Sequence, residues 1–346
     1  MASSQTLTDA RPAFEVLAWS REVVEPLLRQ AVDRLPPPAR RIAGYHFGWH
    51  DEDGTPTRAG GKAIRPALTL LSARAVGGHE RAAAPAAVAV ELAHNYSLLH
   101  DDLIDADEAR RHRPTAWKVF GSAQAILVGD VLHALAFDVL ACGGTALAAH
   151  GTPLLSSALL DLAGGQCADV AFEARTDAVP VDECLEMVRC KTAALLGGAC
   201  ALGALAGGAV PSQVERMRAF GEQLGLAFQM VDDLLGIWGE PSVTGKPVRA
   251  DLAQRKKSLP VVAALASGTP AGDELAELYH RDTPLTDAEL VRAADLVELA
   301  GGRAWAQTQA DDRMESALVE LQADTLVPGA AAELLNIARL ITRRDH

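Results

Sequence analysis

The sequence predicts an all-α protein, and three observations support this fold class. Apolar residues recur at intervals of three and four along nearly every long segment, which is typical of amphipathic helices. Alternating runs of β-branched residues, which would indicate strands, are scarce, whereas alanine, the strongest helix former, is abundant. Most prolines and glycines lie between the periodic segments, where helices would begin and end.

The first predicted helix runs from Phe14 to Leu35, and Pro36-Pro37-Pro38 ends it. The stretch from Gly44 to Gly61 predicts a long loop, and Gly239 to Gly245, rich in glycine and proline, predicts a second one. The other clear periodic segments predict helices over Ala63–Val76, Ala82–Asp107, Ala123–Leu140, Pro153–Glu173, Val181–Ala206, Pro211–Trp238 and Lys257–Ala266.

The length and composition favour one helical domain covering residues 1–346. The chain has 346 residues, of which 49% are hydrophobic, enough to bury a large core. No internal repeat, low-complexity tract or linker interrupts it, and residues 1–12 would form a frayed tail.

The charge and the cysteines exclude several classes of protein. The net charge is -13 and the 32 Lys and Arg residues are spread along the chain, so no basic stripe indicates a nucleic-acid partner. The five cysteines are odd in number and lack C-x-x-C spacing, which predicts free thiols in a reducing compartment. We see no signal peptide and no run of about 18 uninterrupted apolar residues, and therefore expect a cytoplasmic protein without an integral membrane segment.

Two acidic pairs within apolar helical segments are the strongest chemical feature. The first is the segment His100-Asp101-Asp102-Leu103-Ile104-Asp105-Ala106-Asp107-Glu108. At about 100° per residue, Asp101, Asp102 and Asp105 share one helix face, with His94 on the same side. The second pair is Asp232-Asp233. Carboxylates facing a helical cavity would suit Mg²⁺, which prefers a few carboxylates, waters and substrate phosphates.

Cationic residues near these acids predict diphosphate binding. Arg110 and Arg111 follow the first acidic cluster directly. Other basic residues stand after glycines or within helices: Lys62, Arg65, Lys191, Lys246, Lys256 and Lys257. A metal ion bound to one diphosphate, and guanidinium or ammonium groups bound to another, would account for both the acidic pairs and the basic residues.

At this point the sequence resembles the trans-type isoprenyl diphosphate synthases, the polyprenyl synthetase family. The resemblance covers residues 58–262 and rests on six elements in order: GGKAIRP, HDDLIDADEARRHRPT, GQCADVAFE, CKTA, FQMVDD and GKPVRADLAQRKKSLP. It implies an all-helical fold around a deep central cavity, usually as a homodimer, and helices near residues 120–145 are candidates for the dimer face. It also implies magnesium-assisted condensation of isopentenyl diphosphate with an allylic diphosphate.

The resemblance further implies a role for each candidate residue. Magnesium would be held by Asp101, Asp102, Asp105 and Asp232, with Asp233 supporting the second wall and counted among the metal-binding residues. The leaving diphosphate would be bound by Arg110, Lys191, Lys246 and Lys256. Isopentenyl diphosphate would be bound by Lys62, Arg65, His94 and Arg111. Thr192 and Gln229 would stabilise the allylic cation by their dipoles. The catalytic set is thus Asp101, Asp102, Lys191, Thr192, Gln229 and Asp232.

Three positions depart from the family pattern. Gly236 stands where the second motif usually has a third aspartate. Because Asp232 and Asp233 remain, we expect metal binding to survive, and weaker magnesium affinity or altered surroundings is the alternative. Ala63 replaces a commonly basic residue, and His112 stands where glycine is more usual.

In the family, the residues at the fourth and fifth positions before the first motif form the floor of the cavity that holds the growing chain. They are therefore expected to set the product length. Here they are Ser97 and Tyr96, a pair that resembles geranylgeranyl (C20) diphosphate synthases, whereas a bulky pair would indicate farnesyl (C15). A helical wheel places Leu98, not Tyr96, at the centre of the aspartate face. A core-packing role for Tyr96 is therefore the alternative.

Three rival functions were weighed: a synthase of another chain length, a class I terpene cyclase and a non-catalytic partner subunit. A cyclase would carry a second metal motif of Asn, Ser and Glu, which we do not find, and would not need Lys62, Arg65 and Arg111. A partner subunit tends to lose acidic motif residues, as at Gly236, but the first motif is intact.

Overall fold

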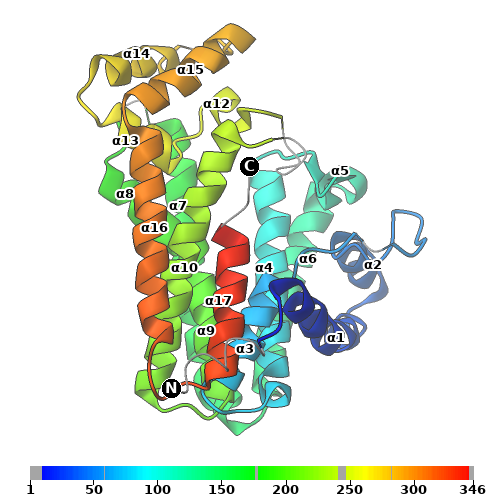
Figure 1. Cartoon of the computed structure of the whole chain (residues 1–346). Helices are drawn as coiled ribbons and strands as arrows, with labels where there is room; N and C mark the ends of the chain where they lie inside the picture. The colour runs from blue at the N-terminus through cyan, green and yellow to red at the C-terminus, as the bar shows by residue number, and fades with distance from the viewer. Residues whose placement is uncertain (1–9, 58, 176–177, 241–246, 282, 343–346) are drawn as a thin grey trace. The chain divides into compact units, whose positions relative to one another are not determined.

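The computed structural model describes residues 10–57, 59–175, 178–240, 247–281 and 283–342 (Figure 1). Its helices are α1 (Ala13–Val32), α2 (Pro37–His46), α3 (Ile64–Ala75), α4 (Glu80–Ile104), α5 (Ala116–Phe120), α6 (Ser122–Ala141), α7 (Thr152–Ala174), α8 (Val181–Val188), α9 (Ala194–Ala206), α10 (Pro211–Trp238), α12 (Ala250–Ala253), α13 (Leu259–Leu265), α14 (Pro270–Tyr279), α15 (Asp287–Leu299), α16 (Gly302–Leu321) and α17 (Pro328–Thr342). Two π-helical turns, η1 (Leu147–Gly151) and η2 (Arg189–Ala193), precede α7 and α9.

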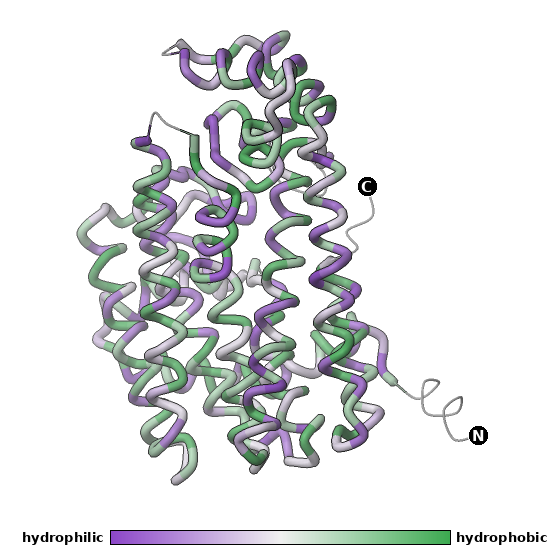
Figure 2. The backbone as a smooth tube through the Cα atoms, turned by 90° about the vertical axis from the view of Figure 1, so that its left-hand side faces the viewer, coloured by the Kyte–Doolittle hydropathy of each residue, from purple (hydrophilic) through white to green (hydrophobic). Residues whose placement is uncertain are grey.

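The only strands in these ranges are β1 (Ala109–Arg110) and β2 (Arg113–Pro114), a two-residue antiparallel hairpin. The predicted all-α fold class is therefore confirmed. Hydrophobic residues recur along the helices with hydrophilic ones between them (Figure 2), as their three- and four-residue spacing requires.

Three predicted boundaries were wrong by three residues each, the first being the end of α1 at Val32 rather than Leu35. Pro36-Pro37-Pro38 does not only end a helix: Pro37 starts α2, which extends through Gly44 to His46. Proline is tolerated in the first turn because its missing N–H would have no intrahelical partner there. The observed loop thus begins after His46, three residues later than predicted. The helix α4 ends at Ile104 rather than Asp107. The predicted loop at Gly239–Gly245 lies mostly outside the described residues.

The chain divides into two compact units. The first contains residues 1–159, 198–218 and 321–337, and the second contains residues 160–197, 219–320 and 338–346. Within the first unit, α4 packs against both α3 and α6. Most residues of α3 and α4 are buried there, which explains their nearly continuous apolar runs. The prediction of one domain stays a prediction.

The second unit has two hydrophobic clusters. One joins α7, α8, α10 and α16 through residues such as Phe172, Met187, Met230 and Ala310. The other joins the end of α10 to α12, α13, α14 and α15 through residues such as Ile237, Leu252 and Leu275. These clusters fix the helices that carry the second acidic pair.

Two stretches are long and apolar enough to cross a membrane, Ser122–Ala141 and Val181–Ala206. The core helices of proteins that never enter a membrane meet the same criterion, and 72% of the most apolar window of Val181–Ala206 is buried. The expected absence of a membrane segment stays a prediction. All five cysteines carry free thiols, as predicted.

A buried carboxylate of α17, Glu333, joins this helix to α3 and to the residue Arg11 just before α1, within the first unit. Glu333 is 4% exposed and accepts hydrogen bonds from Nε and Nη2 of Arg11 at 2.7 and 2.8 Å and from Nη1 of Arg74 at 2.8 Å. Arg11 also stacks over the Trp19 ring. Burial by itself would raise the pKa of Glu333, but the two arginines outweigh it and lower that pKa below its usual range.

We expect Glu333→Gln to lower the free energy of unfolding by about 1–3 kcal/mol at neutral pH, because two guanidinium groups lose their anionic partner. A native pKa below the unfolded one stabilises the fold above the unfolded pKa of about 4.3. That stabilisation is lost as the pH falls through the native pKa, so the difference between variant and wild type should shrink below about pH 4.3. Urea unfolding across this pH range checks the prediction, and a constant difference would contradict it.

Candidate active site

The first acidic motif lies at the C-terminal end of α4 in the first unit. Asp101 and Asp102 occupy its last turn and Asp105 is the C-cap. Asp107 and Glu108 lie beyond the helix, so the predicted run of acids within one helix was wrong. The chain turns there because Ala106 adopts a left-handed conformation, with φ 53°. Asp101 is half-buried, Asp102 is buried and Asp105 is exposed.

Asp102 is the buried anion of this motif. Its Oδ1 accepts a hydrogen bond from Nε of Arg110 at 2.6 Å, and its Oδ2 is buried without a hydrogen-bond partner among the described residues. Burial raises the pKa of Asp102, although the Arg110 charge acts in the opposite direction. Arg110 was predicted to bind a diphosphate; its contact with Asp102 uses one of the five N–H donors of the guanidinium.

The cationic residues after the first loop gather near His94 on α4. Arg65, at the start of α3, donates from Nη1 to Nε2 of His94 at 3.1 Å. Burial, reinforced by the charge of Arg65, lowers the pKa of His94 well below its usual value, so the ring is neutral. Since arginine can only donate, Nε2 of His94 accepts and its Nδ1 carries the proton. Burial also lowers the pKa of Arg65 to about 10.

Arg111 completes this cationic group. Its guanidinium lies directly over Gly61, where an added Cβ would approach Nη2 to 2.6 Å. Arg21 donates to the Gly61 carbonyl oxygen at 3.1 Å. Lys62 is exposed beside them. Four predicted isopentenyl diphosphate ligands (Lys62, Arg65, His94 and Arg111) thus occur around the start of α3 and the facing part of α4.

Glu91 is a carboxylate in this region that the sequence did not single out. It lies one turn before His94, and Nδ2 of Asn95 donates to its Oε1 at 3.0 Å. Burial raises the pKa of Glu91 although Asn95, Arg65 and Arg111 act against it. Glu91 precedes His94 by three residues, and residues three apart on a helix are neighbours, so this spacing could have identified Glu91 as part of the same group.

Tyr96 and Ser97 precede the first motif on α4. Ser97 is buried and its hydroxyl donates to the His94 carbonyl oxygen at 2.9 Å. The Tyr96 ring stacks on His133 of α6 with centroids 4.8 Å apart and meets His100 edge-on at 5.6 Å. Phe137 meets His133 edge-on in turn, at 5.3 Å. The Tyr96 ring is therefore held by packing between α4 and α6.

In the second unit, Lys191 and Thr192 lie on the π-helical turn η2. Gly165 of α7 lies so close that an added Cβ would meet the Lys191 backbone nitrogen at 2.3 Å. Lys191 Nζ donates at 2.5 Å to Oδ2 of Asp169, which lies on α7 as Gly165 does. Asp169 stands in the GQCADVAFE element, but no sequence pattern singles it out from its neighbours there. Single π turns often occur at functional sites.

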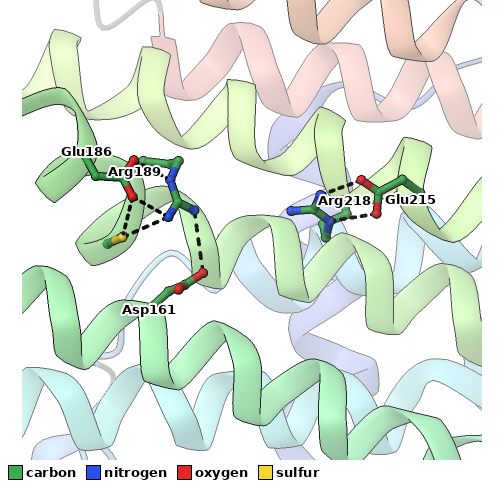
Figure 3. A network of polar contacts seen from close by, with 6 residues as sticks. Asp161, Glu186, Arg189, Glu215 and Arg218 are labelled. Carbon is green, nitrogen blue, oxygen red and sulfur yellow. Dashed lines mark hydrogen bonds and ion pairs between the residues drawn. The ribbon is translucent and has the colours of Figure 1, made fainter. Parts of the chain in front are cut away.

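A surface network holds the start of η2 (Figure 3). Arg189 donates to both carboxylate oxygens of Glu186 at 2.6 and 2.8 Å and lies 3.6 Å from Asp161. Figure 3 also shows the separate pair Arg218–Glu215, three residues apart on α10. Both networks are partly exposed, so each contributes little stability.

A hydrogen-bonded chain links Thr192 to the second acidic motif. Thr192 Oγ1 donates to Oε1 of Gln229 at 2.8 Å, and Gln229 Nε2 donates to Oδ1 of Asp233 at 2.8 Å. The second oxygen of Asp233 accepts from the Leu259 backbone N–H at 3.0 Å. Asp233 is buried, which raises its pKa to about 6. Asp232, its neighbour on α10, is half-buried. Both carboxylate oxygens of Asp233 thus accept hydrogen bonds within this unit, and the metal-binding role of either aspartate stays a prediction.

Lys256 lies among the carboxylates of this unit. Burial acts to lower its pKa, but Asp233, Asp251, Asp169 and Asp232 outweigh that effect and raise it above the usual value. Its neighbour Lys257 instead donates to the backbone oxygens of Phe172 and Arg175 at 2.7 and 2.5 Å. Lys246 lies outside the described residues.

These residues fit a magnesium ion that is completed by substrate. Within the described ranges, no three His, Cys, Asp or Glu side chains are gathered to hold a metal by themselves. Mg²⁺ usually takes one or two carboxylates and fills its remaining positions with water and phosphate oxygens. The partnerless buried oxygen of Asp102 is an anionic group of the kind that such an ion would satisfy.

Comparison with known proteins places the chain in a family. The sequence model described as polyprenyl synthetase matches residues 55–296. The (2E,6E)-farnesyl diphosphate synthase of Mycobacterium tuberculosis is 46% identical over 339 residues, covering 97% of this chain and 94% of that protein. The geranylgeranyl diphosphate synthase of the same organism is 45% identical over 332 residues, covering 95% and 93%.

The fold agrees with this result. The crystal structure of a polyprenyl synthetase from Streptomyces coelicolor A3(2) superposes with a TM-score of 0.90 at 48% identity, covering 94% of this chain and 98% of that one. The chain belongs to the polyprenyl synthetase family. It is accordingly an enzyme, a prenyl diphosphate synthase, as its motifs predicted.

Proposed function

We propose that this enzyme joins isopentenyl diphosphate to an allylic diphosphate and stops at the C20 product, geranylgeranyl diphosphate. The observation that carries the chain length is Tyr96, whose ring is fixed between His100 and His133 while its neighbour Ser97 is small. The farnesyl and geranylgeranyl synthases of Mycobacterium tuberculosis are almost equally similar to this chain. The alternative is therefore a C15 or other prenyl diphosphate synthase.

The allylic diphosphate would be bound by the acidic motifs and their cations. Asp101, Asp102 and Asp232, with Asp105 at the helix end, would hold Mg²⁺ against it. Bound magnesium would neutralise the charge that develops on the departing diphosphate. Cations of this chain would add to that stabilisation: Arg110, Lys191 and Lys256, with Lys246 in the same role. Groups placed before the reaction stabilise such charge more in the transition state than in the ground state.

Isopentenyl diphosphate would be bound by the cationic group around the start of α3 and the facing part of α4. Lys62, Arg65 and Arg111 supply positive charge, and the Nδ1–H of neutral His94 supplies a hydrogen-bond donor. Binding both substrates together would place the double bond close to the allylic cation, and such proximity can be worth about 7–11 kcal/mol.

The Thr192–Gln229–Asp233 chain would act near the allylic carbon. Its hydrogen bonds orient the hydroxyl of Thr192 and the amide of Gln229, so their oxygen dipoles would stabilise positive charge without forming a bond to carbon. The final proton would leave to the released diphosphate, the nearest strong base that the reaction itself provides.

We also propose a homodimer formed through α6, working in the cytoplasm. Ile126 and Leu127 on this helix are 42% and 56% exposed, and a second copy would remove this apolar surface from water. The free thiols support a reducing compartment. Sedimentation at several concentrations should give a dimer; a monomer at every concentration would contradict the proposal.

The direct test is product analysis with Mg²⁺, isopentenyl diphosphate and each of the C5, C10 and C15 allylic diphosphates. A C20 endpoint supports the proposal. A C15 or much longer endpoint contradicts the chain length but keeps the enzyme class. No product from any primer, with the fold intact, would favour the partner-subunit alternative.

We expect Tyr96→Ala to lengthen the main product by at least one C5 unit, because truncation removes the ring that would block the growing chain. Chromatography of the hydrolysed products measures this. Tyr45→Phe is a matched control, since it alters a tyrosine of α2 that donates to the Pro114 carbonyl oxygen and should leave product length unchanged. An unchanged product from Tyr96→Ala would support the packing role alone.

A further inference from the structure

The space above Gly236 is filled by a carboxylate from another helix. Gly236 follows Asp232 by one turn on α10. A Cβ added there would lie 2.2 Å from Oδ2, 2.5 Å from Cγ and 3.0 Å from Oδ1 of Asp251. Asp251 belongs to α12 and is 7% exposed. A side chain at position 236 would therefore require the Asp251 carboxylate to move out of this space.

This contact places the Asp251 carboxylate on the face of α10 that bears Asp232. Residues four apart on a helix are neighbours on one face, so a side chain at position 236 would project beside Asp232. The carboxylate of Asp251 occupies that volume instead. The acidic motif of two aspartates thus has a third carboxylate beside it, which comes from α12.

Asp251 is also tied to Lys256. The Lys256 backbone N–H donates to the Asp251 carbonyl oxygen at 2.8 Å, closing the turn after α12. The carboxylates of Asp251 and Asp233 are among the charges that favour the ammonium form of Lys256. Asp251 therefore supplies the third carboxylate and, through its backbone oxygen, also closes the turn that leads into Lys256.

We propose that Asp251 does the work of a third aspartate in the second acidic motif, as a positioning residue that holds Lys256 for the departing diphosphate. Gly236 then suits this arrangement rather than marking a loss, because a side chain there would displace the Asp251 carboxylate. The inference rests on the proposed function in one respect, namely that Lys256 binds the allylic diphosphate.

The test is a reciprocal exchange of the two positions. Three variants are needed: Gly236→Asp, Asp251→Gly and the double exchange. Titration calorimetry with inorganic diphosphate and Mg²⁺ measures binding without turnover, alongside kcat and KM for each substrate. We expect each single variant to bind diphosphate about 10–100-fold more weakly, as when a supporting group of a metal site is lost. The double exchange should recover at least tenfold over Asp251→Gly.

Two results would overturn the proposal. One is a Gly236→Asp variant that binds diphosphate as tightly as the wild type. The other is a double exchange that binds no better than Asp251→Gly. If Gly236→Asp does not fold, Asp251→Asn carries the test, because it keeps the shape and removes the charge. It should raise KM for the allylic substrate and leave KM for isopentenyl diphosphate unchanged; equal changes in both would contradict a positioning role.

This outcome is separable from the proposed function. Product analysis of the wild-type enzyme tests the reaction and its chain length. The diphosphate affinities of the variants test the exchange of positions 236 and 251 whatever product the wild type makes.

Discussion

Asp102→Asn should lower kcat by about 10²–10³-fold, the loss typical when one preorganised electrostatic group leaves an active site. The reason lies in the structure of the α4 terminus. Asp102 Oδ2 is buried without a partner among the described residues, while Oδ1 accepts from Arg110. An amide has the same shape but carries no charge for a metal ion or for Arg110.

Steady-state kinetics with saturating Mg²⁺, together with thermal unfolding, checks this prediction. Glu215→Gln is the matched control, because Glu215 is an exposed carboxylate that pairs with Arg218 on its own helix (Figure 3). It should change kcat by less than about twofold, as expected for a surface ion pair. An Asp102→Asn enzyme within threefold of wild type would exclude Asp102 from the reaction.

Lys191→Met should lower kcat/KM for the allylic diphosphate by about 10²-fold, at the lower end of the same range. Lys191 is held by Asp169 at 2.5 Å on the π turn η2. In the proposed mechanism its ammonium contacts the departing diphosphate, whereas Asp169 only orients it. Asp169→Asn should therefore cost much less activity, although it breaks the same ion pair.

The comparison of these two variants separates a catalytic role from a structural one. If the pair only stabilised the fold, both variants would lose similar activity and similar melting temperature. Arg189→Gln is the control for a cation on the same turn, because its partners Glu186 and Asp161 form a surface network (Figure 3). It should retain nearly full kcat/KM.

The sequence by itself determined the fold class, the family and the class of enzyme. Helical periodicity is a local property, so helices such as α10 were predicted over their observed range. The motifs carry their side chains at fixed spacings along single helices. Asp101 with Asp102, Lys191 with Thr192, and Asp232 with Asp233 could therefore be selected without a structure.

Local backbone geometry could be predicted from the sequence only in part. His112, predicted to replace a usual glycine, does adopt φ 61°, and Ala63 adopts φ 54°. The sequence thus marked His112 as a position where the chain could turn in the left-handed region, which residues other than glycine enter at a cost. It offered no such signal at Ala63. The end of α4 at Ile104 was missed, because Ala106 gives no signal for a left-handed turn.

Only the tertiary structure decided which groups pair across elements. Asp169 with Lys191, Tyr96 with His133, and Asp251 with Gly236 join residues from 15 to 37 positions apart or on separate helices. Such contacts depend on how helices pack, and packing depends on volumes and close approaches that no spacing rule encodes. Gly236 shows the difference most clearly: the sequence presents a missing aspartate, and the fold fills its place with another.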